Sequence, residues 1–319
     1  MLVCVVIVLG STRVSAKSNQ ASVPSAHSSS NTLATVDTVI QEAIHVGSIP
    51  GAVLIVGHNS SVVYRKAYGN RALEPRREAM TLDTVFDLAS LTKVVATTSA
   101  IMQLFERGQV KMNDAVAKYL PEFGQNGKQD ITVRQLLTHY SGLAPDLDLK
   151  TQWTGKETAY QMAFAEAPQQ APGAAFVYSD INFIVLGALV EKVSGLALQD
   201  YVQQRVFGPL KMSRTRYLPP SAWRAKIAPT EFDDDKRMLR GVVHDPTARR
   251  MLPGLLRVHE QLAPLQAVHR ATYSVRNSQP RVAQEQDKRS SAPGAQLCFR
   301  ATRRNFLGRC RQNCQHLVA

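Results

Sequence analysis

The sequence predicts an α+β fold, in which helices cover an antiparallel sheet. Residues 35–46 place apolar side chains at helical spacing and end at Gly47. Two strand-like runs follow, residues 52–56 and 62–68, with a His-Asn-Ser turn at 58–60 between them. A helix beside a hairpin is typical of a sheet that has helices packed on it.

The rest of the first 200 residues is predicted to be mostly helical. A long helix is expected to begin near Ser90, because apolar residues recur through positions 94–105 at the spacing of a buried helix. Residues 106–196 continue this pattern, with prolines as breaks. The apolar stretch 181–193 is expected to pack beneath whatever site the first helix carries.

Ser90 and Lys93 form the candidate catalytic pair. A separation of three on a helix puts both side chains on one face, about one turn apart. A serine hydroxyl is a poor nucleophile until a base takes its proton, and a neighbouring neutral amine can do so. The partial positive charge of a helix N-terminus favours both a neutral Lys93 and an anionic oxygen at Ser90.

The Ser-x-x-Lys pattern alone is weak evidence, although Ser90 is the only serine in the chain with a lysine three positions later. The alternative interpretation is a helix-capping serine followed by a surface lysine. The sequence around the pair decides between the two interpretations.

Four segments in the expected order resemble the serine β-lactamase and penicillin-binding-protein superfamily, and most closely its branch of class C β-lactamases, DD-peptidases and esterases. They are FDLASLTKVVATTSAIMQLFERGQVKMNDAVAKYLPEF (86–123), ITVRQLLTHYSGL (131–143), APGAAFVYSDINFIVLGALVEKVSG (171–195) and VFGPLKMSRTRY (206–217). The resemblance covers residues 35–251. It implies a β-lactamase/transpeptidase-like fold with a helical subdomain.

The resemblance places the family's second motif, Tyr-x-Asn, at Tyr178-Ser179-Asp180. It implies that Tyr178 acts as a base or proton relay and that Asp180 binds substrate and Lys93. Asp180 departs from the family's Asn, and its negative charge would favour the ammonium form of Lys93. The alternative for Tyr178 is a buried aromatic residue with a satisfied hydroxyl. Another Tyr-x-Asn, at residues 68–70, precedes the nucleophile and is rejected for that reason.

The implied function is a serine hydrolase that works through an acyl-enzyme on a β-lactam, a D-Ala peptide or an ester, without a cofactor or metal. Peptidoglycan-type peptides or small esters would be its partners. The alternative is a catalytically inactive binding protein that keeps the cleft. No P-loop, no G-x-G-x-x-G and no metal-ligand spacing appear in the sequence. A Ser-His triad lacks support because there is no G-x-S-x-G elbow, and His139 is expected to be structural.

The N-terminus predicts export. Residues 1–16 contain an apolar run and a small-residue site, Val14-Ser15-Ala16, as in a secretory signal peptide. The expected location is therefore periplasmic or secreted. A short buried strand is the alternative, and the run is too short for a membrane span. The polar, serine-rich residues 17–34 are expected to be a disordered linker.

The tail, residues 252–319, departs from the family. It carries +8 of the chain's +13 net charge, and the third family motif, Lys/His-Thr-Gly, is absent from it. We expect an aperiodic, disordered tail that results from a truncation or frameshift after Met251, with impaired activity and missing C-terminal strands. A basic nucleic-acid-binding arm is the alternative. Cys310 and Cys314 are not expected to bind metal.

Overall fold

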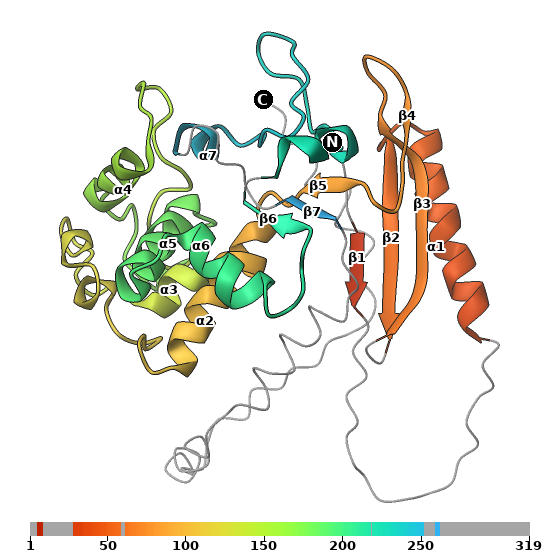
Figure 1. Cartoon of the computed structure of the whole chain (residues 1–319). Helices are drawn as coiled ribbons and strands as arrows, with labels where there is room; N and C mark the ends of the chain where they lie inside the picture. Colours follow the sequence, from red (N-terminus) through yellow and green to blue (C-terminus); the bar gives the residue numbers. More distant parts are fainter. Residues whose placement is uncertain (1–4, 9–27, 59–60, 218, 252–258, 262–319) are drawn as a thin grey trace, which may run out of the picture. The chain divides into compact units, whose positions relative to one another are not determined.

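The computed structural model describes residues 5–8, 28–58, 61–217, 219–251 and 259–261 (Figure 1). All of them belong to one compact unit that spans residues 1–278. The α+β class predicted from the sequence is confirmed, since the unit combines helices with a mainly antiparallel sheet.

The larger sheet contains four strands in the order β1 (Val5–Val8), β2 (Gly51–His58), β3 (Ser61–Ala72) and β4 (Glu78–Ala79). Strands β2 and β3 form the predicted antiparallel hairpin, while the centre of its turn lies outside the described residues. Strand β1 runs parallel to β2. It lies along one edge of β2, and the signal-peptide interpretation of residues 1–16 stays a prediction.

Strand β2 is buried on both faces, which explains its continuous apolar sequence. On one face Val53 and Ile55 pack with Phe86 and other apolar side chains. On the opposite face Ala52 and Leu54 pack with side chains of helix α1 (Ser28–His45), which lies alongside the hairpin (Figure 1).

The helix α1 begins earlier than the sequence indicated. Residues 28–34, which we expected to be part of a disordered linker over 17–34, lie in this helix. The helix propensity of serine is only modestly below that of alanine, so a polar composition does not exclude a helix. Residues 17–27 lie outside the described residues.

The helical part surrounds α5 and holds the main apolar core. Its elements are η1 (Lys93–Thr98, a π-helix), α2 (Ser99–Glu106), η2 (Val116–Lys118), η3 (Pro121–Phe123), α3 (Val133–Leu137), α4 (Lys156–Ala165), α5 (Asp180–Ser194), α6 (Leu198–Val202), η4 (Gln203–Phe207, a π-helix) and α7 (Pro246–Met251). The short helix η5 (Ser221–Lys226) contributes no residue to this core. Residues 106–196 are less helical than predicted, because turns and loops separate the helices there.

Helix α5 is apolar on all sides, as expected for a helix inside a core. Within the described residues no single helix is long and apolar enough to cross a membrane. Only α5 and the segment Leu198–Phe207 taken together are long and apolar enough for a membrane span, and the chain bends by 73° between them. Buried residues run through both elements of this pair.

A second sheet of three short strands lies in the order β5 (Val85–Asp87), β7 (His259–Gln261), β6 (Thr215–Arg216). Strand β7 pairs with both neighbours in antiparallel register. Three residues of the tail thus form a strand, and the expectation of an aperiodic, disordered tail stays a prediction for the rest of it. A three-residue strand is too short to show a period, and the hydrogen bonds of its two neighbours define it. Residues 252–258 and 262–319 lie outside the described residues, and with them Cys310 and Cys314.

Candidate active site

The candidate nucleophile lies in a turn between β5 and the π-helix η1. Ala89 has a positive φ of 47°, and the exposed Ser90 follows it directly. The turn closes through hydrogen bonds from the backbone N–H groups of Thr92 and Lys93 to the carbonyls of Ala89 and Ser90, at 3.0 Å each. The helix thus starts close to Ser90, as its sequence indicated.

The spacing of three brings the predicted pair together. Lys93 Nζ donates a hydrogen bond to Ser90 Oγ at 3.2 Å. The Lys93 side chain is only 9% exposed, so its ammonium group lies in a largely desolvated place where charge interactions are strong. The surface-lysine alternative does not describe this residue.

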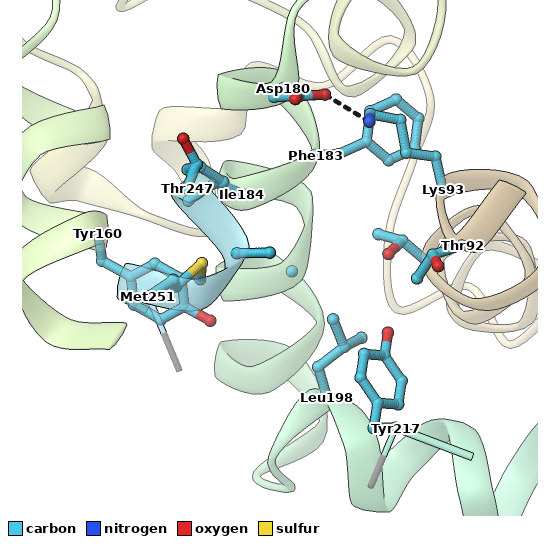
Figure 2. A pocket seen from close by; sticks show the side chains of 13 residues that line it. Thr92, Lys93, Tyr160, Asp180, Phe183, Ile184, Leu198, Tyr217, Thr247 and Met251 are labelled. Carbon is cyan, nitrogen blue, oxygen red and sulfur yellow. Dashed lines mark ion pairs between the residues drawn. The ribbon is translucent and has the colours of Figure 1, made fainter. Parts of the chain in front are cut away.

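Asp180 is the charged partner of Lys93. The two side chains form an ion pair in which Oδ1 of Asp180 contacts Nζ, and the carboxylate side chain is 18% exposed (Figure 2). Asp180 is the first residue of α5, and its N–H donates to Pro145 O at 2.6 Å. Lys93 thus donates a hydrogen bond to Ser90 and forms an ion pair with Asp180, and it can accept the Ser90 proton only in its neutral form.

The start of α5 is fixed by buried polar contacts. Ser179 caps the helix and donates from its hydroxyl to Ala144 O at 2.6 Å. In the first turn the buried Asn182 accepts a hydrogen bond from Ser141 at 2.6 Å. These contacts anchor the loop around residues 141–145 to α5, and thereby hold Asp180 beside Lys93.

Tyr178 presents its ring, not its hydroxyl, to the site. Lys93 Nζ lies 5.0 Å from the centre of the Tyr178 ring and 5.8 Å from that of Phe183, distances typical of cation–π contacts. No hydrogen bond joins the Tyr178 hydroxyl to Ser90 or Lys93 in the described part of the chain. Tyr178 is 45% exposed, so the buried-aromatic alternative does not describe it, and its role as a base or proton relay stays a prediction.

His139 explains the orientation of Tyr178. Its ring stacks on Tyr178 with 4.5 Å between the ring centres, and it also contacts Phe176 and Phe183. Nδ1 of His139 accepts a hydrogen bond from the Ser179 N–H at 3.0 Å. Burial lowers the pKa of His139 below its ordinary value of 6.5, and the nearby Lys93 charge lowers it further. His139 is thus a neutral packing residue, in line with the structural role expected from the sequence.

A cavity of about 130 Å³ is lined by Lys93 and Asp180, while Ser90 is not among its lining residues. Lys93 and Asp180 lie at one end of it, and the rest of the lining is largely apolar (Figure 2). The described residues contain no group of three or more His, Cys, Asp or Glu side chains placed to hold a metal ion.

Asp87 and His244 are near the nucleophile turn, and the sequence reasoning did not select them. His244 Nδ1 lies 3.2 Å from Asp87 Oδ2. The two residues are 157 positions apart, and no spacing rule connects them. The position of Asp87 three residues before Ser90 was the one available signal.

Ser90 and Lys93 lie one turn apart at the start of η1, and Lys93 faces Asp180 in the first turn of α5. This arrangement, together with the fold, indicates the class of protein to which the chain belongs. The family model described as Beta-lactamase matches residues 36–300. The chain belongs to this family, and the match extends beyond Met251, where we expected the resemblance to end.

Individual relatives agree with this assignment. A provisionally named D-alanyl-D-alanine carboxypeptidase of Escherichia coli (strain K12) is 29% identical over 235 residues, which are 67% of this chain and 54% of the relative. An N-acetylmuramyl-L-alanine amidase of Bacillus subtilis (strain 168) is 31% identical over 243 residues, 69% of this chain and 54% of the relative. The chain spans about half the length of these curated relatives.

A solved structure supports the fold. The crystal structure of a class C β-lactamase superposes with a TM-score of 0.63 at 24% identity, and the match covers 77% of this chain and 66% of that one. At this identity the likeness concerns the fold alone.

Proposed function

We propose that the protein is a serine hydrolase that forms an acyl-enzyme at Ser90. The observation that carries the proposal is the 3.2 Å hydrogen bond between the exposed Ser90 hydroxyl and the largely buried Lys93 amine. A nucleophile within hydrogen-bond reach of its base, with the base oriented by a third group, is the usual arrangement for covalent catalysis. Asp180 is the third group here.

The proton steps follow from these contacts. Lys93 first loses its extra proton to solvent, and the neutral amine then accepts the Ser90 proton while Oγ bonds to the substrate carbonyl carbon. Lys93 returns that proton to the leaving group as the carbon–heteroatom bond breaks. A water molecule then attacks the acyl group, its proton passes through Lys93 to Ser90 Oγ, and the acid product leaves.

The oxyanion of the intermediate needs hydrogen-bond donors. Among the backbone carbonyls of the described residues none accepts a hydrogen bond from the N–H of Ser90, and we propose this N–H as one donor to the substrate carbonyl. Loss of one such donor costs about 10²–10³ in rate in a studied protease. We propose that the lack of a Lys/His-Thr-Gly motif in this sequence lowers the rate of acylation.

Substrates would carry a carbonyl with a leaving amine or alcohol. The names of the two relatives, a carboxypeptidase and an amidase, support amides of the peptidoglycan type as the first class to test. The β-lactam and ester classes predicted from the sequence remain part of the proposal. Parallel assays with a D-Ala-D-Ala peptide, a chromogenic cephalosporin and a nitrophenyl ester, each with wild type and Ser90→Ala, separate these classes.

The second candidate function is an inactive binding protein. It is favoured by the ion pair with Asp180, because this contact stabilises the form of Lys93 that cannot act as a base. A fluorescent penicillin separates the two functions. Covalent labelling that disappears in Ser90→Ala supports the hydrolase, whereas reversible binding by folded protein without labelling supports the binder.

We also propose that the protein is exported, on the basis of the apolar run and small-residue site within residues 1–16. Cleavage after Ala16 would remove strand β1 and uncover an edge of β2. Mass spectrometry of the N-terminal peptide from cell and extracellular fractions tests this proposal. An uncleaved N-terminus confined to the cytoplasm would contradict it.

A further inference from the structure

The carboxylate of Asp87 is buried beside the nucleophile turn. Its side chain is 2% exposed. A buried carboxylate is stable only when donors satisfy its oxygens. One oxygen, Oδ1, accepts the N–H of Ala89 at 2.9 Å, and the other, Oδ2, faces His244 Nδ1 at 3.2 Å.

The first of these contacts fixes an unfavourable backbone conformation. Ala89 has a φ of 47°, which a residue with a Cβ adopts at a cost of about 1–2 kcal/mol. The local hydrogen bond from its N–H to Asp87 offsets part of this cost. Since Ser90 follows directly, the dihedral angles of Ala89 determine where the Ser90 hydroxyl lies relative to Lys93.

The second contact ties the same carboxylate to a distant segment. His244 lies just before α7, and its backbone is held by Arg249, whose guanidinium donates to the carbonyls of Val243 and His244 at 3.0 and 2.7 Å. Asp245 Oδ1 accepts from Ala248 N at 2.7 Å. The imidazole therefore projects from a fixed turn, with 39% of its side chain exposed.

Electrostatics favour a protonated ring at this position. The hydrogen bond with Asp87 raises the pKa of His244 above its ordinary value of 6.5, and Glu231 and Asp245 add to this effect. The charged groups identified around the ring are thus these three acids, together with the Arg249 guanidinium on its backbone carbonyl. Because a carboxylate oxygen only accepts hydrogen bonds, Nδ1 of His244 must carry a proton to donate to Asp87 Oδ2.

We propose that His244 is a positioning residue for the nucleophile: it holds the Asp87 carboxylate, which holds the left-handed turn at Ala89 that aims Ser90 at Lys93. This inference rests on the proposed function, because Ser90 is its target. It assigns to residues 87 and 244 a role in the acylation step without contact to the substrate.

A pair of variants tests the proposal. In His244→Ala, Asp87 loses its contact with the imidazole, and the turn that directs Ser90 is held less firmly. Small misplacements of reacting groups cost up to about 10²-fold, so we expect the acylation rate constant at saturating penicillin to fall by about 10–100-fold. The concentration of penicillin for half-saturation should stay within about threefold. His244→Asn puts an amide N–H near the position of Nδ1, and it should retain most of the wild-type rate.

Two controls make the result specific. His45→Ala, at the exposed end of α1, should leave both constants unchanged. Hydrogen exchange of the peptide that covers residues 85–92 gives a readout without activity. Its protection should decrease in His244→Ala and be restored in His244→Asn, and this holds even if the wild type is not acylated and the hydrolase proposal fails.

Three outcomes would overturn the proposal. They are acylation by His244→Ala at the wild-type rate, equal losses in His244→Ala and His244→Asn, and unchanged exchange over residues 85–92 in folded His244→Ala. If His244→Ala does not fold, His244→Asn and His244→Gln are compared instead. The longer glutamine side chain cannot place its N–H at the same point, so equal rates in these two variants would also overturn the proposal.

Discussion

Asp180→Asn is the substitution that separates a catalytic Lys93 from one held as a cation. It removes the negative charge beside the buried amine and keeps the size of the side chain. Loss of one partner from a fully buried ion pair costs about 3–5 kcal/mol. Asp180 is 18% exposed, the new amide oxygen can still accept a hydrogen bond from Lys93, and two ring faces contact the cation. We therefore expect a destabilisation of about 2 kcal/mol.

The same substitution should accelerate acylation of the folded protein. The neutral amine is the form that accepts the Ser90 proton, and the ion pair opposes its formation. We expect labelling of Ser90 by fluorescent penicillin to become faster in Asp180→Asn, because the ion pair that holds the Lys93 amine is removed.

Urea unfolding measures the stability change, and the labelling time course measures the rate. Asp200→Asn, an exposed acid near the start of α6, is the matched control and should change neither. Slower labelling of Asp180→Asn without loss of stability would refute this reasoning, because the carboxylate would then be needed in the reaction itself.

Three further changes test the fold and its electrostatics. Because the pKa of His244 is raised in the folded protein, the protonated ring stabilises the fold fully below pH 6.5, and this stabilisation is lost as the pH rises through the raised pKa. Urea unfolding midpoints measured from about pH 5 to pH 9 should therefore fall less at alkaline pH in His244→Asn than in wild type. Thr132→Ala removes the N-cap of α3 and its capping box, and should lower the free energy of unfolding by about 1 kcal/mol; no change would show that the cap is not needed. Leu104→Ala, in the main core at 1% exposure, should lower the free energy of unfolding by about 2–5 kcal/mol. Val94→Ala, at an exposed position, should change it by less than about 0.5 kcal/mol, and equal losses in the two variants would contradict the packing described above.

Local patterns predicted the parts of the fold that depend on neighbouring residues. The hairpin follows from two short apolar runs around a turn, and the closeness of Ser90 and Lys93 follows from the geometry of one helical turn. The α+β class follows from the same patterns. Each of these features is determined within about a dozen residues, where periodicity is informative.

Contacts between distant segments could not be predicted in this way. The ring of Tyr178 faces Lys93 because it stacks on His139, and that stacking depends on how a separate loop packs on α5. The Asp87–His244 contact joins residues 157 positions apart. Strand β7 has three residues and no readable period. In all three cases tertiary packing, not local propensity, decides the structure.

The most direct measurement is the identification of the acylated residue by mass spectrometry after incubation with penicillin. Cleavage after Arg77 and Lys93 gives a peptide of residues 78–93, in which Ser90 is the only serine. We expect the mass of the opened penicillin on Ser90, none in Ser90→Ala, and a much slower increase in Lys93→Ala. An adduct on another residue, equal labelling of Ser90→Ala, or no adduct on the folded wild type would contradict the assignment of Ser90 as the nucleophile.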